Sequence, residues 1–318
     1  MFIIATDEAG YGPKLGPLVI AASTWQVQLP SNQPNDEAAL SLAFAPLTQP
    51  VAIGKLKVRI DDSKAIFKSG SGLDGLHAIV CASHMACGKR FGSGREMIEY
   101  VADTDFEEIF ATPWLNRDCS SPLLDDASTA NAIAQWQSTG CLLLDVKARV
   151  ITAKRFNQFC NEGANKADLL SRSTLQLVRN SVEATSETDI RVFCDRHGGR
   201  RYYAGVIAHI FHEGSVAVVS ESQSESVYRC DWQGKQIRLA FTVKGDRFTP
   251  VAMSSLHAKY LRERMMASFN LYFAENYVGE SPLKPTAGYP VDADRFLTQT
   301  AALRQQLKII DLDLVRQR

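Results

Sequence analysis

The chain has 318 residues, of which 45% are hydrophobic and 22% charged, and its 35 Lys and Arg residues balance 35 Asp and Glu residues. This composition is typical of a globular protein with one large or two ordinary domains, and it excludes disorder, collagen and a coiled coil as the dominant character. A net charge of zero argues against a protein that coats nucleic acid by bulk charge, although it leaves room for a local basic groove.

The sequence carries no sign of export or of membrane insertion. The N-terminal MFIIATDEAG lacks the basic start and the long apolar core of a signal peptide, and no later stretch approaches the roughly 18 consecutive apolar residues of a membrane span. The seven cysteines are scattered without a C-x-x-C pair, which is typical of reduced core thiols. We therefore expect a cytoplasmic protein without a membrane partner.

The first sixty residues predict three strands. Residues 2–6, 16–25 and 51–60 are rich in strand-forming or alternating apolar residues, and turn residues separate the first two strands. Three strands in succession favour an antiparallel meander. Between the second and third strands, residues 26–50 include four prolines and predict a surface excursion with a short helix.

Helices and strands share the rest of the chain. The triplet Asp61-Asp62-Ser63 is typical of a helix start, and residues 88–150, with their scattered Gly and Pro, are interpreted mainly as an insertion. We expect helices at 73–87, 165–184, 251–278 and 292–308, and strands at 189–195, 216–219 and 226–243, the last with a turn at Gln233-Gly234. This order predicts a mixed α/β fold.

One set of potential zinc ligands lies in the predicted helix 73–87. His77, Cys81, His84 and Cys87 follow at spacings of four, three and three residues and share roughly one face of a helix. A straight helix does not easily wrap four ligands around one tetrahedral ion, and His and Cys are common in ordinary cores. A packed helix is therefore favoured over a zinc site.

Four carboxylates stand at strand ends or turns: Asp7, Glu8, Asp195 and Asp246. A buried strand rarely ends on a carboxylate without a use for it, because desolvating the charge costs several kcal/mol unless it is paired or bound to a metal. Converging carboxylates can hold Mg²⁺ or similar hard cations, and two such ions promote phosphodiester cleavage. The alternative interpretation is that these residues are caps and turn residues.

Five motifs resemble those of the ribonuclease HII family. DEAGYGPKLGP at 7–17 is similar to the family's DEAGRGPLAGP, with eight of eleven positions identical. In the family's order there follow DDSK at 61–64 (family DDSKK), VFCD at 192–195 (the strand that ends on the third acid), VKGDRFTPVAMSSLHAKYLRERMM at 243–266 (KGD…AASILAKVTRDRMM) and TAGYPVDADRFL at 286–297 (HKGYGTKxHxxAL). These islands cover roughly half of the chain.

The resemblance implies a ribonuclease H-like fold, in which helices flank a mixed sheet with an antiparallel three-strand meander. It predicts a catalytic domain at 1–270, with insertions at about 26–50, 88–150 and 220–240, and a helical extension at 271–318. The insertions are candidates for a clamp, a protein partner surface or a substrate lid.

The resemblance also implies a metal-dependent endoribonuclease, a hydrolase that cuts the RNA strand of RNA/DNA hybrids or single ribonucleotides embedded in DNA. The family's four metal-binding acids fall on Asp7, Glu8, Asp195 and Asp246, with Mg²⁺ or Mn²⁺ as cofactor. Because adjacent strand residues point to opposite faces, we expect the first strand to break at Asp7 and Glu8, which Gly10 would permit.

Family positions that contact the substrate fall on Gly10, Gly12, Lys64, Ser255, Lys259 and Tyr289. Two positions depart from the family. Tyr11 stands where the family has Arg or Lys, and Ala287 replaces the Lys before the Gly-Tyr pair. A phenol at position 11 can stack on the substrate or donate one hydrogen bond, or it can simply pack against an insertion.

The segment CDRHGGRRYY follows the third acid and offers a basic-aromatic cluster. Arg200 and Arg201 with Tyr202 and Tyr203 have the character of a strand-binding loop, and Gly198-Gly199 would let the loop bend over a substrate. A solvated loop is an equally good interpretation.

Three functions remain in competition at this point. The first is cleavage of RNA in RNA/DNA hybrids, carried by the four matched acids. The second is a nuclease of the same fold with a different structure-specific nucleic-acid substrate, motivated by Tyr11, Ala287 and the insertions. The third is a non-catalytic nucleic-acid-binding module, which the intact acid set disfavours.

Overall fold

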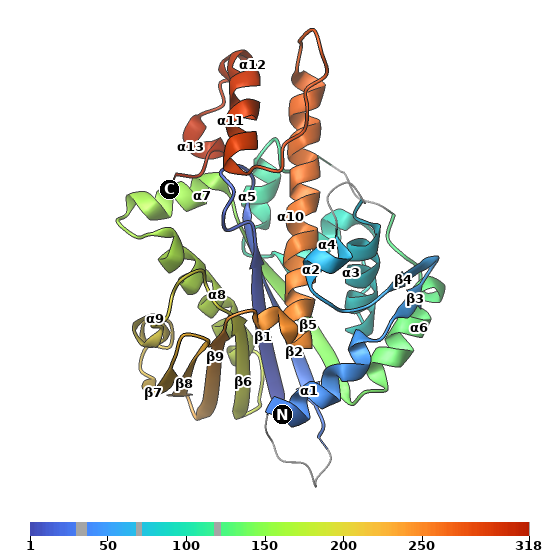
Figure 1. Cartoon of the computed structure of the whole chain (residues 1–318), viewed down its shortest axis with the longest axis vertical. Coiled ribbons are helices and arrows are strands. Elements are labelled where there is room, and N and C mark those ends of the chain that lie inside the picture. Colours follow the sequence, from blue (N-terminus) through green and yellow to red (C-terminus); the bar gives the residue numbers. More distant parts are fainter. Residues whose placement is uncertain (30–36, 68–71, 118–121, 318) are drawn as a thin grey trace.

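A seven-stranded mixed sheet lies at the centre of the computed structural model, which describes residues 1–29, 37–67, 72–117 and 122–317 (Figure 1). The strand order is β5-β2-β1-β6-β9-β8-β7. These strands are β1 (Phe2–Ala9), β2 (Leu18–Val27), β5 (Cys141–Ile151), β6 (Asp189–Asp195), β7 (Ser215–Glu221), β8 (Glu225–Trp232) and β9 (Lys235–Thr242). The mixed α/β class, and a mixed sheet that contains an antiparallel three-strand meander, are confirmed.

Two hydrophobic cores cover the two faces of the sheet. Because strand side chains alternate, Ile3 packs into the core around helix α10 (Thr249–Asn276), whereas Ile4 packs into the core around helix α8 (Lys166–Glu183). Both helices agree with the predicted ranges. In the described part of the chain no helix has the length and apolarity that a membrane span requires.

The third strand of the meander is β5 and not residues 51–60, so that prediction is wrong. β1 pairs antiparallel with β2, and β2 pairs antiparallel with β5. Residues 51–60 instead turn back on themselves at Gly54, whose φ is +56°, and form the separate two-stranded sheet of β3 (Val51–Ile53) and β4 (Leu56–Val58). A glycine in the left-handed region ends the extended run too early for a core strand.

The ranges 88–150 and 220–240, whose assignment as insertions stays a prediction, both contribute strands to the central sheet. The first ends in β5 and contains helices whose side chains Met97, Ile109 and Trp136 enter the core around α10. The second is largely the hairpin of β8 and β9, joined at Gln233-Gly234 as predicted. In β5, polar and exposed residues alternate with buried ones, so its sequence did not stand out as a core strand.

The remaining helices pack around the sheet, and the C-terminal helices α11, α12 and α13 lie beyond one of its ends, at the top of Figure 1. They are α1 (Glu37–Phe44), η1 (Ala45–Thr48), α2 (Ser63–Ile66), α3 (Asp74–Ala86), α4 (Gly94–Val101), α5 (Phe106–Ala111), α6 (Asp126–Gln137), α7 (Ala153–Asn161), α9 (Ala204–Ile210), η2 (Gly245–Arg247), α11 (Pro290–Gln299), α12 (Ala301–Gln306) and α13 (Asp311–Leu314). Helix α10 continues past residue 270, and the predicted division of the chain there stays a prediction.

Helix α3 holds the predicted His/Cys set as part of its packing. His77 lies 2.7 Å from the hydroxyl of Tyr260 through its Nδ1, and His84 packs edge-on against His257. Among the residues that the structure describes, these side chains do not converge as a group of metal ligands. The arrangement is that of a packed core helix.

Segments from the far end of the sequence hold the loop that follows β1. The backbone N–H groups of Lys14 and Leu15 donate to the carbonyl oxygen of Gly288 at 2.8 and 3.2 Å, and the N–H of Arg316 donates to the carbonyl oxygen of Lys14 at 2.9 Å. Gly288 has φ +84°, and a Cβ there would lie 2.4 Å from the carbonyl oxygen of Leu15. Only glycine fits this approach.

We expect Gly288→Ala to lower the free energy of unfolding by roughly 3 kcal/mol, from about 1–2 kcal/mol of left-handed strain and about 1–3 kcal/mol of overpacking. Gly163→Ala is the matched control, because Gly163 has φ +89° and a Cβ at that position would meet no atom within 4 Å. Its free energy of unfolding should fall only by the cost of the left-handed strain, about 1–2 kcal/mol. Urea unfolding measures both, and equal losses would contradict the proposed close approach.

Candidate metal centre

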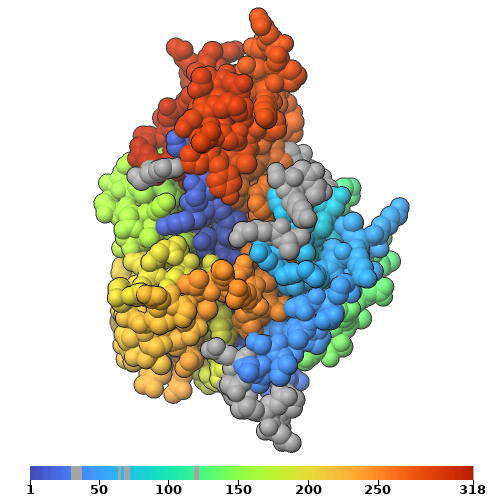
Figure 2. Space-filling view, in the orientation of Figure 1, coloured from blue at the N-terminus to red at the C-terminus, as the bar shows by residue number. Residues whose placement is uncertain are grey.

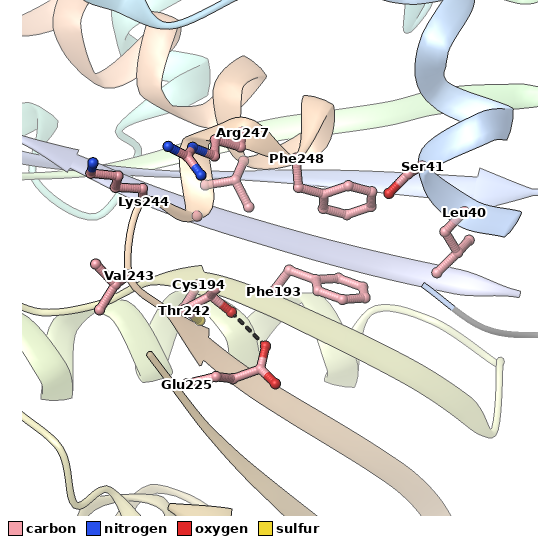
Figure 3. A pocket seen from close by; sticks show the side chains of 12 residues that line it. Leu40, Ser41, Phe193, Cys194, Glu225, Thr242, Val243, Lys244, Arg247 and Phe248 are labelled. Carbon is pink, nitrogen blue, oxygen red and sulfur yellow. Dashed lines mark hydrogen bonds between the residues drawn. The ribbon is translucent and has the colours of Figure 1, made fainter. Parts of the chain in front are cut away.

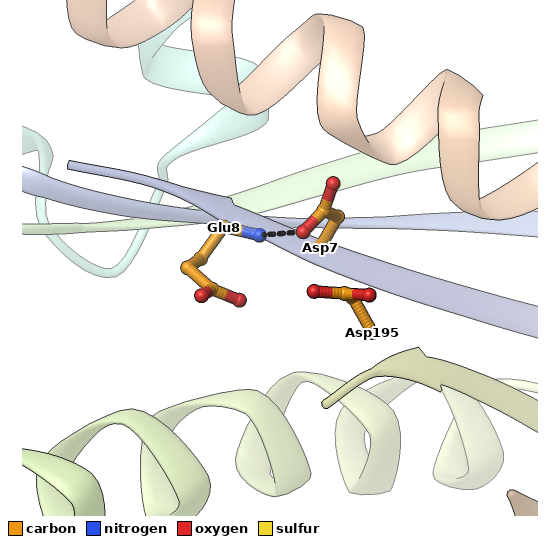
Figure 4. Close-up of side chains that lie close together, drawn as sticks. All are labelled: Asp7, Glu8 and Asp195. Carbon is orange, nitrogen blue, oxygen red and sulfur yellow. Dashed lines mark hydrogen bonds between the residues drawn. The ribbon is translucent and has the colours of Figure 1, made fainter. Parts of the chain in front are cut away.

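Three carboxylates converge at the carboxyl ends of two neighbouring parallel strands. Asp7 and Glu8 come from β1 and Asp195 from the last position of β6, and each offers an oxygen atom within 4.8 Å of the others (Figure 4). Ligands of open α/β sheets bind at this edge, where the strands end and the chains leave in different directions. Three of the four acids named from the sequence thus lie together.

The end of the β1–β6 ladder creates the space for these side chains. The parallel pairing stops at Thr6 and Cys194, whereas β1 remains paired with β2 through Ala9. The predicted break of β1 at Asp7 and Glu8 is therefore wrong. One flank of the strand is open there, which lets Asp7 and Glu8 reach one site although neighbouring strand residues start on opposite faces.

Backbone amides fix the orientation of two of these carboxylates. The N–H of Gly245 donates to Asp195 Oδ1 at 2.7 Å, and the N–H of Glu8 donates to Asp7 Oδ1 at 2.7 Å. A Cβ at Gly245 would lie 3.1 Å from the Cα of Asp195, so glycine allows the two segments to meet. The carboxylates are positioned by the sheet and its connections, which favours a precise site.

The electrostatics of this group suit a cation. Burial, followed by the charge of Asp195, raises the pKa of Asp7 to about 7, although a hydrogen bond from Ser255 opposes the rise. Burial and the charge of Asp7 raise the pKa of Glu8 well above its usual value. Three crowded carboxylates repel one another, and a hard divalent cation with a preference for oxygen ligands, such as Mg²⁺ or Mn²⁺, relieves that repulsion.

Asp246 lies beside this group but outside it. It belongs to η2, directly after the bonded Gly245, and its charge also raises the pKa of Asp7. Its carboxylate is not among the three that converge within 4.8 Å. The structure therefore places the fourth predicted acid near the centre, on the connection that follows β9.

The glycine-rich loop after β1 bends sharply beside the carboxylates. Gly10 has φ +89°, and a Cβ there would lie 2.4 Å from Nε of Arg262 and 2.7 Å from the carbonyl oxygen of Pro17. Gly12 is exposed and has no atom within 4 Å of such a Cβ. In the space-filling view the dark-blue residues of this N-terminal region lie at the centre of the face, between the red C-terminal segment and the yellow-to-orange segment (Figure 2).

Tyr11 packs against the loop that follows β6. Its ring lies 4.7 Å from Nζ of Lys166, and a Cβ on Gly198 would lie 3.3 Å from the ring. Burial and the charge of Glu8 raise the pKa of Tyr11, and Arg200 opposes them. The phenol thus stands next to Glu8 and is held by Lys166.

The predicted basic-aromatic cluster at 200–203 is divided between the core and the surface. Tyr203 is fully buried and stacks on Phe241 with ring centroids 3.7 Å apart, whereas Tyr202 is 64% exposed. Arg200 forms an ion pair of 2.7 Å with Asp168 of α8, and Arg201 is half-buried. The packing of Tyr203 on β9 could not be read from the local sequence, because the partner lies far along the chain.

His197 is a structural residue. Its Nδ1 lies 3.0 Å from the hydroxyl of Ser171, and burial lowers its pKa to about 3. The ring therefore stays neutral.

The other predicted substrate residues occupy three different environments. Ser255 is buried, its hydroxyl lies 3.2 Å from the hydroxyl of Ser63, and it donates to Asp7. Lys259 forms an ion pair of 2.8 Å with Glu263, and Tyr289 is 55% exposed. The side chain of Lys64 lies outside the described residues.

Comparisons with known proteins return structures and no sequence matches. No protein-family model and no curated protein matches the chain. Similar solved structures include ribonuclease H2 from Pyrococcus horikoshii, with 14% identity, a TM-score of 0.40 and coverage of 99% of this chain and 92% of that chain. Bst-RNase HIII in complex with Mn²⁺ has 12% identity, a TM-score of 0.41 and coverage of 99% and 66%.

RNase HII from Archaeoglobus fulgidus, in its complex with PCNA, has 12% identity, a TM-score of 0.39 and coverage of 100% of this chain and 95% of that chain.

The raised pKa of Asp7 predicts a pH-dependent loss of stability in the metal-free protein. The unfolded chain releases this proton near pH 3.8, whereas the folded protein keeps it to about pH 7. The folded state thus binds more protons in this window, and the free energy of unfolding falls as the pH rises through it. Asp7→Asn should reduce the loss, to which Glu8 still contributes, and raise the free energy of unfolding at pH 8 by roughly 2–4 kcal/mol.

Denaturant unfolding from pH 4 to pH 8 in the presence of a chelator measures this effect. Asp189→Asn is the matched control, because Asp189 begins the same strand β6 and is exposed. It should leave the slope unchanged. Identical pH profiles for Asp7→Asn and the wild type would contradict the assignment.

Proposed function

We propose that this protein is a metal-dependent endoribonuclease that cleaves the RNA strand of RNA/DNA hybrids or ribonucleotides embedded in DNA. The observation that carries the proposal is the convergence of Asp7, Glu8 and Asp195 at the carboxyl ends of β1 and β6. These residues lie within the motifs that resemble ribonuclease HII. Hard oxygen ligands in this number and crowding are suited to Mg²⁺ or Mn²⁺ and not to a softer metal.

The same three carboxylates would hold the metal, with Asp246 as a fourth ligand on the adjoining connection. Divalent ions in such a site would polarise the phosphate and activate the attacking water of a two-metal hydrolysis. The protein's own contribution is to set the positions. The Gly245 N–H holds Asp195, and the Glu8 N–H together with Ser255 holds Asp7, so these two ligands are oriented before the substrate binds.

The surface around the centre offers contacts for the substrate backbone. The exposed Gly12 and the bent Gly10 would let the strand approach the loop closely, and the exposed Tyr289 would stack on a sugar or base. Tyr11 and Arg200 border the Glu8 side, and Arg201 follows Arg200 in the chain. Lys64, Ser255 and Lys259 belong to the α2–α10 side. Ser255, with its hydroxyl on Asp7, serves this site through the metal ligand.

A second candidate is a nuclease with the same centre and a different structure-specific nucleic acid as substrate. The observation in its favour is the environment of Tyr11, which packs against Lys166 and the Gly198 loop. Ala287 likewise leaves no cation before the Gly-Tyr pair. The positive charge available to a substrate on this side is therefore arranged differently from that of the resembled family.

A cleavage assay with Mg²⁺ and with Mn²⁺ tests the proposal. We expect Asp7→Asn to reduce cleavage of an RNA/DNA hybrid by roughly a thousandfold, because it removes a charged ligand of the centre. Asp189→Asn, at the exposed start of β6, should retain wild-type activity. Full activity of Asp7→Asn would rule out the proposed catalytic centre.

A substrate panel decides between the two candidates. Hybrid duplex, DNA with one embedded ribonucleotide, double-stranded RNA and branched DNA are compared under the same conditions. We expect cleavage of the first two substrates. Cleavage confined to either of the last two, and lost in Asp7→Asn, would favour the second candidate.

A further inference from the structure

A second cavity opens beside the acid centre, between α1, η2 and the carboxyl ends of β6 and β9 (Figure 3). We name it the β6–β9 pocket, and Leu40, Ser41, Phe193, Glu225, Arg247 and Phe248 are among its lining residues. Its volume of about 290 Å³ lies at the lower end of the range of small-molecule sites. It has room for a single small ring system and no more.

The apolar part of the pocket is suited to a flat ring. Phe193 and Phe248 pack against each other with centroids 4.7 Å apart and an interplanar angle of 55°, and both remain partly accessible. Leu40 and Val251 extend this apolar wall. Nucleobases stack on aromatic side chains of this kind, whatever their identity, because every base has a π-face.

Glu225 adds a selective polar group to this wall. Its Oε1 accepts a hydrogen bond from the hydroxyl of Thr242 at 2.8 Å, and Figure 3 shows the carboxylate beside Thr242 at the pocket. A carboxylate only accepts hydrogen bonds, so it favours ligands with N–H donors. Cytosine, adenine and guanine carry such an amino group, whereas uracil presents a carbonyl oxygen at the position of cytosine's amino group.

Two cations border the pocket. Lys244 and Arg247 line it, are exposed and form no ion pair with any residue that the structure describes. Lys244 is held in the left-handed region with φ 59° and ψ 46°, next to the Gly245 N–H that bonds Asp195. Unpaired Lys and Arg side chains at the mouth of an aromatic cavity fit the phosphate of a nucleotide.

The pocket shares a wall with the proposed metal centre. Phe193 and Asp195 are two residues apart on β6, so they point to the same face at a separation of about 7 Å along the strand. Gly245 lines the pocket and also bonds Asp195. A nucleotide in the pocket would therefore adjoin the phosphodiester at the carboxylates.

We propose that the β6–β9 pocket binds one unpaired nucleotide next to the cleaved bond, with its base on Phe193 and Phe248 and its phosphate on Lys244 and Arg247. Glu225 makes bases with an amino group the preferred ligands. The proposal rests on the proposed nuclease function for the position of the cut, but a free nucleoside monophosphate offers the same chemistry. A base pair is too large for the cavity, so the enzyme selects sites where a nucleotide is unpaired.

Titration with CMP and with UMP tests the pocket directly. The two nucleotides have nearly the same size and differ by an amino group against a carbonyl oxygen. Calorimetry on the metal-free wild type should give CMP an affinity about tenfold higher than UMP, and ribose 5-phosphate should bind more weakly than either. Glu225→Gln should remove the preference. Equal affinities for all three compounds, or no binding, would overturn the proposal.

A filled pocket provides the structural control. Ser41→Trp places a large ring into the cavity from the exposed face of α1 and should abolish CMP binding. Leu42→Trp is the matched variant, because Leu42 is 68% exposed on the same helix and does not line the pocket. It should bind CMP as the wild type does. Retained CMP binding by Ser41→Trp would place the nucleotide elsewhere and overturn the assignment.

A cleavage assay shows whether the pocket takes a nucleotide of the substrate strand or only a free nucleotide. It compares hybrids with and without one unpaired cytidine beside the ribonucleotide. The wild type and Leu42→Trp should prefer the unpaired site several-fold, and Ser41→Trp should lose the preference while its Mn²⁺ binding is unchanged. An absent preference in the wild type, together with CMP binding, would mean that the pocket takes free nucleotide only and would overturn its role at the cut. Failure of the nuclease function itself would appear separately, as full cleavage by Asp7→Asn.

Discussion

Mutual repulsion of three crowded, partly buried carboxylates is the constraint on which the rest of the site depends. Like charges at such distances stay together only when the surrounding backbone gives them no room to separate. Here α10 is tied to the sheet, because the hydroxyl of Ser254 donates to the carbonyl oxygen of Ala5 at 2.8 Å and accepts the N–H of Ser23 at 3.1 Å. The frame that holds the acids is thus rigid on the side where Asp7 is anchored.

Local sequence signals predicted the strand ends on which Asp7, Glu8 and Asp195 lie, but they did not show that Asp246 stands outside this group. Strand β6 ends on Asp195 as predicted, and the long helices agree with their amphipathic patterns. The carboxyl ends of parallel strands lie at the same edge of a sheet, so carboxylates at the ends of β1 and β6 are expected to meet there. The predicted break in β1 was wrong. The site opens because β1 stops pairing with β6 after Thr6, while β1 itself stays paired with β2.

What the sequence did not reveal depends on partners far along the chain. β5 became the third strand of the meander because β2 pairs with it across more than a hundred residues, a contact that no local pattern encodes. Tyr203 was assigned to a surface cluster, yet Phe241 of β9 offers it a stacked partner in the core. A tyrosine in a loop can be buried or exposed, and its environment depends on whether the assembled sheet provides an aromatic partner.

The attachment of the loop after β1 to Gly288 and Arg316 has a consequence for biosynthesis. The loop is translated among the first residues of this sequence, whereas the residues that fasten it are translated among the last. A ribosome that adds about 5–20 residues each second exposes β1 and its acids long before these contacts exist. The nascent chain therefore fastens this loop only after residues 288 and 316 have been made, so a product truncated before them would carry the acids without the fastened loop beside them.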